Sequence, residues 1–224
     1  MRAGAMAVLA ALAAAIPAAA QTPGNGAVAP SPEMARFQQY VTSPDYLKSV
    51  ETVVLGGEHD ITPECKGAKA LGRVGLVLFA MPKFKDGVAA PVAGAWKDRI
   101  RVDRCGSQVT HNVLIDVEPD GPHVGLLLPG DTDLPVPMQF RALQAGAEEA
   151  MKAGKCRDPN RVIVSNTRQD KVLEPVKADP KGILVAGKWR EVWTFRACGK
   201  DQKVGMVFSA DGKGSATFQA SPAK

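Results

Sequence analysis

The sequence of 224 residues contains few of the residues on which catalysis and metal binding usually depend. Its three histidines, His59, His111 and His123, have no serine or cysteine nucleophile signature beside them, so we assign them surface or capping roles. No Cys-x-x-Cys motif and no nearby pair of histidines supplies the ligand spacing of a zinc site. No glycine-rich phosphate loop opens a predicted helix. We therefore predict no metal and no cofactor, and we favour a non-catalytic protein over an enzyme.

Clustered charge and long apolar segments are missing as well. The 28 basic and 23 acidic residues give a net charge of +5, and both signs are interspersed along the chain. Nucleic-acid-binding domains need a clustered basic face, so we predict no nucleic-acid partner. Beyond residue 20, no stretch approaches the roughly 18 apolar residues that a membrane helix requires. We therefore expect a soluble product without a transmembrane segment.

Residues 1–20 have the parts of a cleaved secretory signal. One charge, Arg2, precedes an Ala/Val/Leu run that ends in three alanines before Gln21. Removing this signal leaves 224 minus 20, or 204, residues, which begin with a leader rich in Pro, Gly and Ala over 21–32. We expect the protein to be periplasmic or secreted, in a compartment where disulfides form.

A duplication organises the rest of the chain. Residues 185–199 read VAGKWREVWTFRACG, and residues 92–106, found 93 positions earlier, read VAGAWKDRIRVDRCG. Six identities in fifteen, including Trp and Cys, are hard to obtain by chance, so we infer an internal repeat. The repeat predicts two modules, over 33–128 and 138–220. The segment 129–137 contains three prolines and a glycine, and we interpret it as the linker between them.

The four cysteines are predicted to form one disulfide within each module. Cys65 and Cys105 fall in the first repeat, and Cys156 and Cys198 fall at corresponding places in the second. Four cysteines allow three pairings, and the duplication favours Cys65 with Cys105 and Cys156 with Cys198. Each bridge would close a loop of about 40 residues and stabilise its module by roughly 4 kcal/mol in the chain-entropy model.

Each module is predicted to contain a helical part followed by antiparallel strands. In the first, Ser31-Pro32-Glu33 and Ser43-Pro44-Asp45 are helix start signals, and Gly56-Gly57 predicts the helix end. Strands follow over 73–80, 96–105, 109–117 and 124–128. In the second, a helix that contains 140–151 ends at Gly154. Strands follow over 161–164, 189–198, 204–208 and 215–218, with a polar loop over 165–182 after the first of them.

The fold class that follows is α+β, with two tandem modules that each place a helix across a roughly four-stranded antiparallel sheet. In outline each module is similar to a cystatin-like roll. This likeness concerns shape, and shape does not give function.

The repeated strand carries the candidate site residues. A period of two puts Trp189, Glu191 and Trp193 on one face, which must be the face against the helix. In the first copy, Trp96 and Asp98 share the equivalent face. Each carboxylate is either held by an arginine, backbone amides or an indole donor, or acts as a general acid or base whose pKa is raised by apolar surroundings. We favour the first, because no second carboxylate or histidine completes an acid/base pair.

Three functional hypotheses follow. The leading one is a non-catalytic binding protein of the cell envelope, whose partner is an unknown envelope component or protein, with Trp96, Asp98, Trp189, Glu191 and Trp193 as candidate ligand contacts. The second is an envelope-acting hydrolase that uses Asp98 or Glu191 in a cleft between the modules. The third is a small-protein inhibitor of enzymes, which small disulfide-linked modules would permit.

The period of two also raises a question about the bridges. Cys105 and Cys198 fall in phase with the polar face of the strand, which would put the disulfide outside the sheet. Either the strand ends or bulges before the cysteine, or the bridge covers the outer surface.

Overall fold

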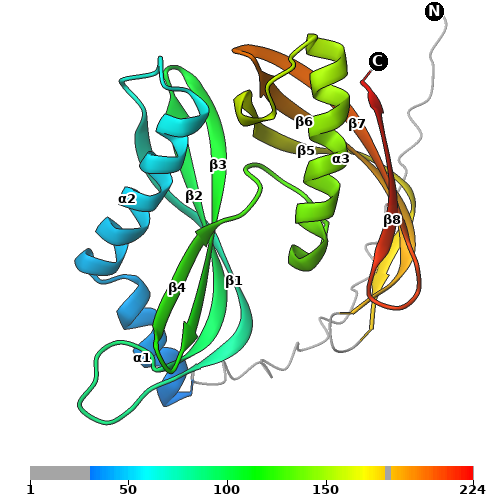
Figure 1. The fold of residues 1–224 in the computed structure, drawn as a ribbon. Helices are drawn as coiled ribbons and strands as arrows, with labels where there is room; N and C mark the ends of the chain where they lie inside the picture. Colours follow the sequence, from blue (N-terminus) through cyan, green and yellow to red (C-terminus); the bar gives the residue numbers. More distant parts are fainter. Residues whose placement is uncertain (1–30, 180–182, 224) are drawn as a thin grey trace, which may run out of the picture. The chain divides into compact units, whose positions relative to one another are not determined.

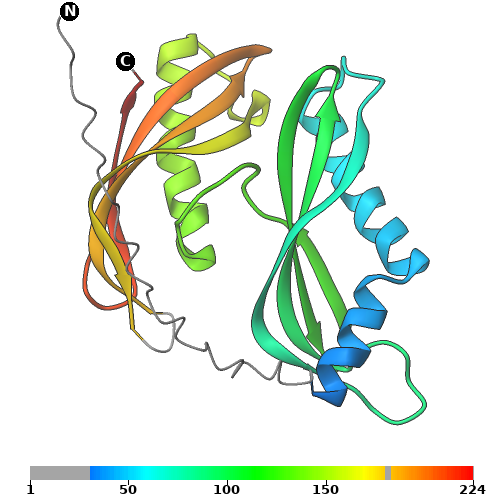
Figure 2. The same cartoon turned by 180° about the vertical axis from the view of Figure 1, so that it is seen from behind.

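The computed structural model describes residues 31–179 and 183–223. The predicted signal over 1–20 and residues 21–30 of the predicted leader lie outside these ranges. Two modules follow one another along the described chain, and each has a four-stranded antiparallel sheet with a long helix on one face (Figure 1). Figure 2 shows the same pairing of helix and sheet from behind. The predicted α+β class with two similar modules is confirmed.

The first module consists of two helices followed by a sheet in the order β1-β2-β3-β4, in which neighbouring strands pair antiparallel. Serine caps begin both helices as the sequence predicts, since Ser31 Oγ accepts from Met34 N at 3.3 Å and Ser43 Oγ accepts from Tyr46 N at 3.4 Å. The elements are α1 (Pro32–Val41), α2 (Pro44–Ile61), β1 (Lys69–Lys83), β2 (Ala93–Arg104), β3 (Ser107–Glu118) and β4 (Gly121–Leu126).

The second module repeats this order with one α-helix and the sheet β5-β6-β7-β8. Its elements are α3 (Val136–Gly154), a 3-10 turn (Pro159–Arg161), β5 (Val162–Ala178), β6 (Leu184–Ala197), β7 (Lys200–Ala210) and β8 (Ala216–Pro222). None of the helices in the described ranges has the length and apolar character needed to cross a membrane.

The disulfides form within the modules, as the duplication predicts. Cys65 bonds Cys105 and Cys156 bonds Cys198, with Cα atoms 5.8 and 5.6 Å apart. The strands end one residue before the second cysteine of each pair, and φ is +46° at Cys105 and +50° at Cys198. A glycine with positive φ follows each of them, which is the backbone of a type I′ hairpin turn. The strand therefore ends before the cysteine, and this resolves its apparent place on the polar face.

Helix α2 continues past its predicted end. Gly56 and Gly57 predict a stop, but the helix runs to Ile61. The prediction is wrong because Gly57 serves packing: a Cβ atom there would overlap the side chain of Leu126 on β4. Burial of Ile61 and the hydrogen bonds of Glu58 to Arg104 and His111 then hold the last turn in place.

The predicted polar loop over 165–182 is wrong for most of its length, because β5 continues to Ala178 and pairs with β6. This strand lies at the edge of its sheet, and every residue from Arg168 to Ala178 is exposed. A strand with water on both faces needs no apolar alternation, so its sequence carries no strand periodicity.

The linker is hydrogen-bonded to both sheets. Its backbone reaches β3 through Gly130 N and Thr110 O at 2.6 Å, and β5 through Thr167 N and Pro129 O at 2.8 Å. Gly130 has a φ of +89°, and a Cβ atom there would overlap the carbonyl oxygen of Thr167. Asn112 of β3 also donates from Nδ2 to the carbonyl oxygens of Gly130 in this segment and of Leu128 just before it. The segment that separates the modules in sequence therefore joins them in space.

Candidate functional site

A groove of about 550 Å³ opens between the helices and the sheet of the first module. In the register of this sheet, Trp96 of β2 pairs with Ile115 of β3, and Ile115 pairs with Val124 of β4. Trp96 and Ile115 are both buried, Val124 is exposed, and Ile115 and Val124 form the strand side of the groove. The remaining lining comes from α1, α2, the residues between them, the β1–β2 loop and the start of β4: Arg36, Gln39, Tyr40, Ser43, Asp45, Tyr46, Ser49, Val50, Val53, Ala89, Ala90 and Pro122.

The second module is filled at the equivalent place. The residues that correspond to Trp96, Ile115 and Val124 are Trp189 of β6, Phe208 of β7 and Phe218 of β8. Trp189 pairs with Phe208, and Phe208 pairs with Phe218. The Trp189 and Phe208 rings stack with centroids 5.2 Å apart, and the Phe208 and Phe218 centroids are 6.3 Å apart. Aromatic rings thus stand in the second module where isoleucine and valine line the groove of the first.

Two tyrosines form the inner wall of the groove. Tyr40 and Tyr46 meet edge to face with centroids 5.1 Å apart, and both lie near the ring of Trp96. Burial raises the pKa of both phenols above the ordinary value, so both hydroxyls are neutral donors at physiological pH. The Tyr46 hydroxyl bonds Asp98, whereas the hydrogen bonds within the described ranges include none from the Tyr40 hydroxyl.

Arg36 holds the loop that forms one side of the groove. Its Nη2 donates to the carbonyl oxygens of Lys85 and Val88, both at 2.8 Å, and its guanidinium lies 4.6 Å from the Phe84 ring centroid. These contacts fix the segment next to Ala89 and Ala90, which line the groove.

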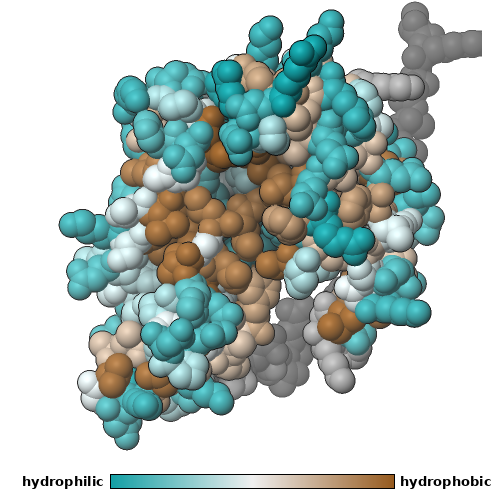
Figure 3. All heavy atoms as spheres, viewed as in Figure 1, coloured by the Kyte–Doolittle hydropathy of each residue, from teal (hydrophilic) through white to brown (hydrophobic). Residues whose placement is uncertain are grey.

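Apolar side chains also gather on the surface beside the groove. Figure 3 shows hydrophobic residues in the middle of the face that carries α2, β4 and α3. Of the large apolar residues on β4 and α3, Val124, Leu126 and Phe140 are exposed. Val124 therefore belongs both to the groove and to the exposed apolar surface.

Asp98, predicted as a candidate site residue, is a fully buried carboxylate with a bidentate arginine partner. Arg73 Nε and Nη2 donate to its two oxygens at 2.7 and 2.6 Å. The Tyr46 hydroxyl donates to Oδ2 at 3.0 Å and accepts from Trp96 Nε1 at 2.8 Å. This chain of bonds ties the first turn of α2 to β1 and β2.

Glu191 is the equivalent carboxylate of the second module, and its partners are neutral. Trp189 Nε1 donates to Oε1 at 2.9 Å and Trp193 Nε1 donates to Oε2 at 2.7 Å. Thr132 Oγ1 and Asp133 N, just before α3, donate to Oε1 at 3.0 and 3.1 Å. Burial raises the pKa of Glu191, and these donors partly offset the rise.

The five predicted ligand contacts, Trp96, Asp98, Trp189, Glu191 and Trp193, have no exposed surface. They form two clusters, one in each module, and none of them lines the groove. Trp96 and Asp98 are joined to it through Tyr46, which does. A direct ligand contact by any of the five stays a prediction that requires the core to open.

The first module has a second buried polar cluster, at the C-terminal end of α2. Glu58 accepts from Arg104 Nε and Nη2 at 2.6 and 2.9 Å, and its Oε2 lies 2.7 Å from His111 Nε2. Burial raises the pKa of Glu58, but the hydrogen bonds from His111, Arg104 and Thr62 outweigh it and lower the pKa to about 2. This cluster is not predicted from the sequence, because its residues are far apart along the chain. The surface or capping role predicted for His111 is wrong, because the residue is 1% exposed.

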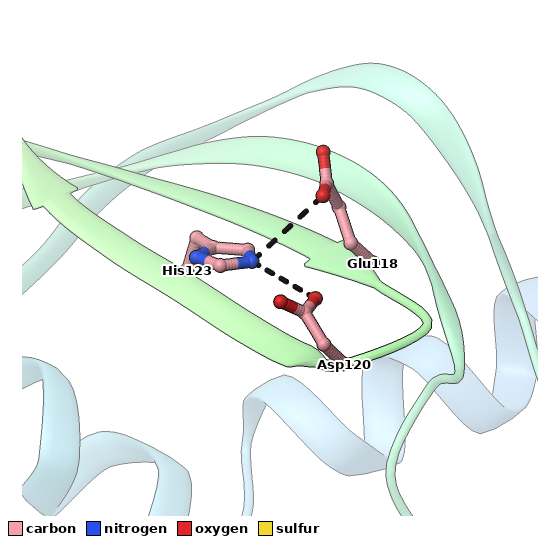
Figure 4. A group of neighbouring side chains, drawn as sticks. All are labelled: Glu118, Asp120 and His123. Atoms are coloured by element: carbon pink, nitrogen blue, oxygen red, sulfur yellow. Dashed lines mark hydrogen bonds and ion pairs between the residues drawn. The ribbon is translucent and has the colours of Figure 1, made fainter.

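The hairpin between β3 and β4 carries an exposed group that resembles a metal site in composition. Figure 4 shows Glu118 and Asp120 directed at the same nitrogen of His123, which lies 3.8 Å from Glu118 Oε2 and 3.1 Å from Asp120 Oδ1. The hydrogen bond to Asp120 raises the pKa of His123. Glu118 and Asp120 both face the Nε2 proton of His123, and a cation would have to displace that proton. The geometry is therefore that of a surface ion pair.

No protein-family model matches the chain, and searches of curated proteins and of solved structures return no match. Function is therefore inferred from geometry.

Proposed function

We propose that the chain is an exported, non-catalytic binding protein whose first module holds the apolar part of a ligand in the groove between α1, α2 and β4. The groove is concave, it has tyrosine and aliphatic walls, and it carries a few polar side chains at its rim. Binding sites for small molecules commonly have this composition. The two disulfides and the signal-like N-terminus support a place outside the cytoplasm.

The observation that carries the proposal is the difference between the two modules at one row of the sheet. Ile115 and Val124 leave space in the first module, whereas Phe208 and Phe218 occupy the equivalent positions in the second. The second module shows that aromatic residues can fill this space. The first module keeps the space open, which supports a binding role for the groove.

Filling the groove tests the proposal. Val124→Phe places in the first module the residue that stands at the equivalent position in the second, and we expect it to weaken binding of a neutral apolar dye such as N-phenyl-1-naphthylamine at least tenfold. Val172→Phe is the matched control, because Val172 has the same exposure of 48% on an edge strand of the second module. Fluorescence titration of the disulfide-intact protein measures both. Equal binding by the wild-type protein and Val124→Phe would contradict the proposal.

The hydrolase and inhibitor hypotheses stay predictions. A hydrolase that uses Asp98 or Glu191 needs its substrate to reach a carboxylate without exposed surface. Replacing both acids by their amides and finding an envelope-hydrolysing activity unchanged would remove that hypothesis. A direct inhibition assay against candidate enzymes tests the other.

A further inference from the structure

We infer that the ligand of the groove is a single-chain amphiphile, with an aliphatic tail and an uncharged head group that forms hydrogen bonds. This inference rests on the proposed function and adds the chemical class of the ligand. It follows from the length of the groove, from the distribution of polar side chains along it, and from the balance of charge in its lining.

The groove is elongated along α2. Its lining includes Ser43, just before the first turn, and Val53, ten residues further along the helix. At 1.5 Å per residue, this stretch of helix is about 15 Å long. A space of this length and of about 550 Å³ suits an extended chain better than a compact ring system.

The lining changes from polar to apolar along this length. Toward α1 and the first turn of α2 the side chains are mostly polar, and Gln39, Tyr40 and Ser43 belong to this end. Further along α2 the lining consists of Ser49, Val50 and Val53. The Ser49 hydroxyl already donates to the carbonyl oxygen of Asp45 at 2.8 Å, and the two valines lie on the helix side opposite Ile115 and Val124 of the sheet. A ligand that matches this arrangement has one polar end and one apolar end.

The polar end carries no net charge. Its two charged side chains are Arg36 and Asp45, one of each sign. The Arg36 guanidinium already donates to the carbonyl oxygens of Lys85 and Val88. A charged head group would therefore meet one like charge for each opposite one. The Tyr40 hydroxyl is a neutral donor, and it suits the oxygen of an alcohol, ester or amide.

Chain length provides the first test. A series of 1-alkanols of increasing length competes with the dye for the wild-type protein. Burial of each added methylene improves the binding free energy by about 0.8 kcal/mol, which lowers the dissociation constant about fourfold. The dissociation constant should therefore fall by this factor per methylene until the groove is full, and then level off. An affinity that does not change with length, or that keeps rising beyond the length of the groove, would overturn the inference of a bounded tail site.

Head-group chemistry provides the second test. At one chain length we expect the alcohol to bind at least fivefold more tightly than the carboxylate or the trimethylammonium ion. Tyr40→Phe should weaken the alcohol about twofold to tenfold, as for loss of one neutral hydrogen bond, and should weaken the alcohol by more than it weakens the dye. Equal or tighter binding of either ion would overturn the inference about the head group.

The two proposals fail in different ways. If the dye binds and Val124→Phe abolishes its binding, but the alkanols do not compete, the ligand class is wrong and the groove remains a binding site. If the dye does not bind the wild-type protein in a saturable manner, the proposed function itself fails.

Discussion

The two modules have the same order of strands, the same disulfide and a buried carboxylate at the same point of the second strand, yet they differ in what lies between helix and sheet. Aromatic side chains fill the second module, with Phe208 stacked on Trp189 and next to Phe218. The first module has aliphatic residues at the equivalent of both phenylalanines and a groove beside them. The two modules therefore share the strand order and the disulfide, whereas the side chains between helix and sheet have diverged.

The same divergence appears at the other end of the sheet. Arg104 and His111 of the first module surround the carboxylate of Glu58. At the equivalent register positions the second module has Ala197 and Val204, both buried and apolar. A buried ionic group is weak support for stability, and its partners become essential once it is present. We therefore expect the first module to be the more fragile of the two.

The largest expected effect comes from removing one partner of the buried carboxylate. Arg104→Ala leaves Glu58 charged and without its bidentate partner, which should lower the free energy of unfolding by about 3–5 kcal/mol. Urea denaturation measures this loss, and hydrogen exchange should locate it in the first module.

Arg196→Ala is the matched control for that experiment. Arg196 Nη1 lies 2.6 Å from Glu64 Oε1, but the Glu64 side chain is 58% exposed. Loss of such a surface pair should cost less than about 1 kcal/mol. An Arg104→Ala variant no less stable than Arg196→Ala would show that the two modules do not differ in this way. Adding Glu58→Gln to Arg104→Ala should recover part of the loss, because the unpaired charge is then gone.

Acid should affect the two modules in opposite directions. The pKa of Glu58 is lowered to about 2 in the folded chain, so the stability that its ion pairs provide is present above the unfolded value of 4.5 and is lost as the pH falls toward 2. The loss amounts to about 3 kcal/mol for a shift of this size. The groups that face this carboxylate are Arg104, His111 and Thr62.

The contribution of Glu191 to stability depends on pH in the opposite direction. Its pKa is raised in the folded chain, so its contribution is fully present below the unfolded value of 4.5 and declines as the pH rises through the folded pKa. Hydrogen exchange measured by mass spectrometry from pH 7 down to about pH 3, corrected for intrinsic rates, should show the first module opening before the second. Simultaneous opening of both modules at acid pH would contradict this comparison.

Much of the fold can be predicted from the sequence because the duplication supplies it. Two copies of one segment, each with a cysteine at the same place, predict the disulfide pairing without any knowledge of the fold. The predictions that are wrong, such as the loop over 165–182, fall where local sequence and tertiary role differ. The sequence of an exposed edge strand is polar and resembles that of a loop. The glycine pair in α2 has the pattern of a helix end, although Gly57 makes room for Leu126.

The buried face of the repeated strand could also be predicted, because a period of two directly places Trp96 with Asp98 and Trp189 with Glu191. The groove could not, since it arises where two helices, a loop and two strands meet. In the cluster around Glu58, Arg104 and His111 lie 46 and 53 positions after Glu58 in the sequence, and no local pattern connects them. One signal was available: Ile115 and Phe208 are separated by the 93 positions of the repeat, and the smaller residue marks the open copy.

The smallest expected change in stability accompanies the most direct test of the comparison. Phe208→Ile together with Phe218→Val gives the second module the strand residues of the first, and we expect it to cost about 2 kcal/mol through loss of buried rings. If the strand residues determine the groove, the variant should bind two equivalents of the apolar dye where the wild-type protein binds one. Dye titration with a folded control by circular dichroism measures this. A folded variant that still binds one equivalent would show that α1, whose Phe37 and Tyr40 pack edge to face on Trp96 and which the second module lacks, is what creates the groove.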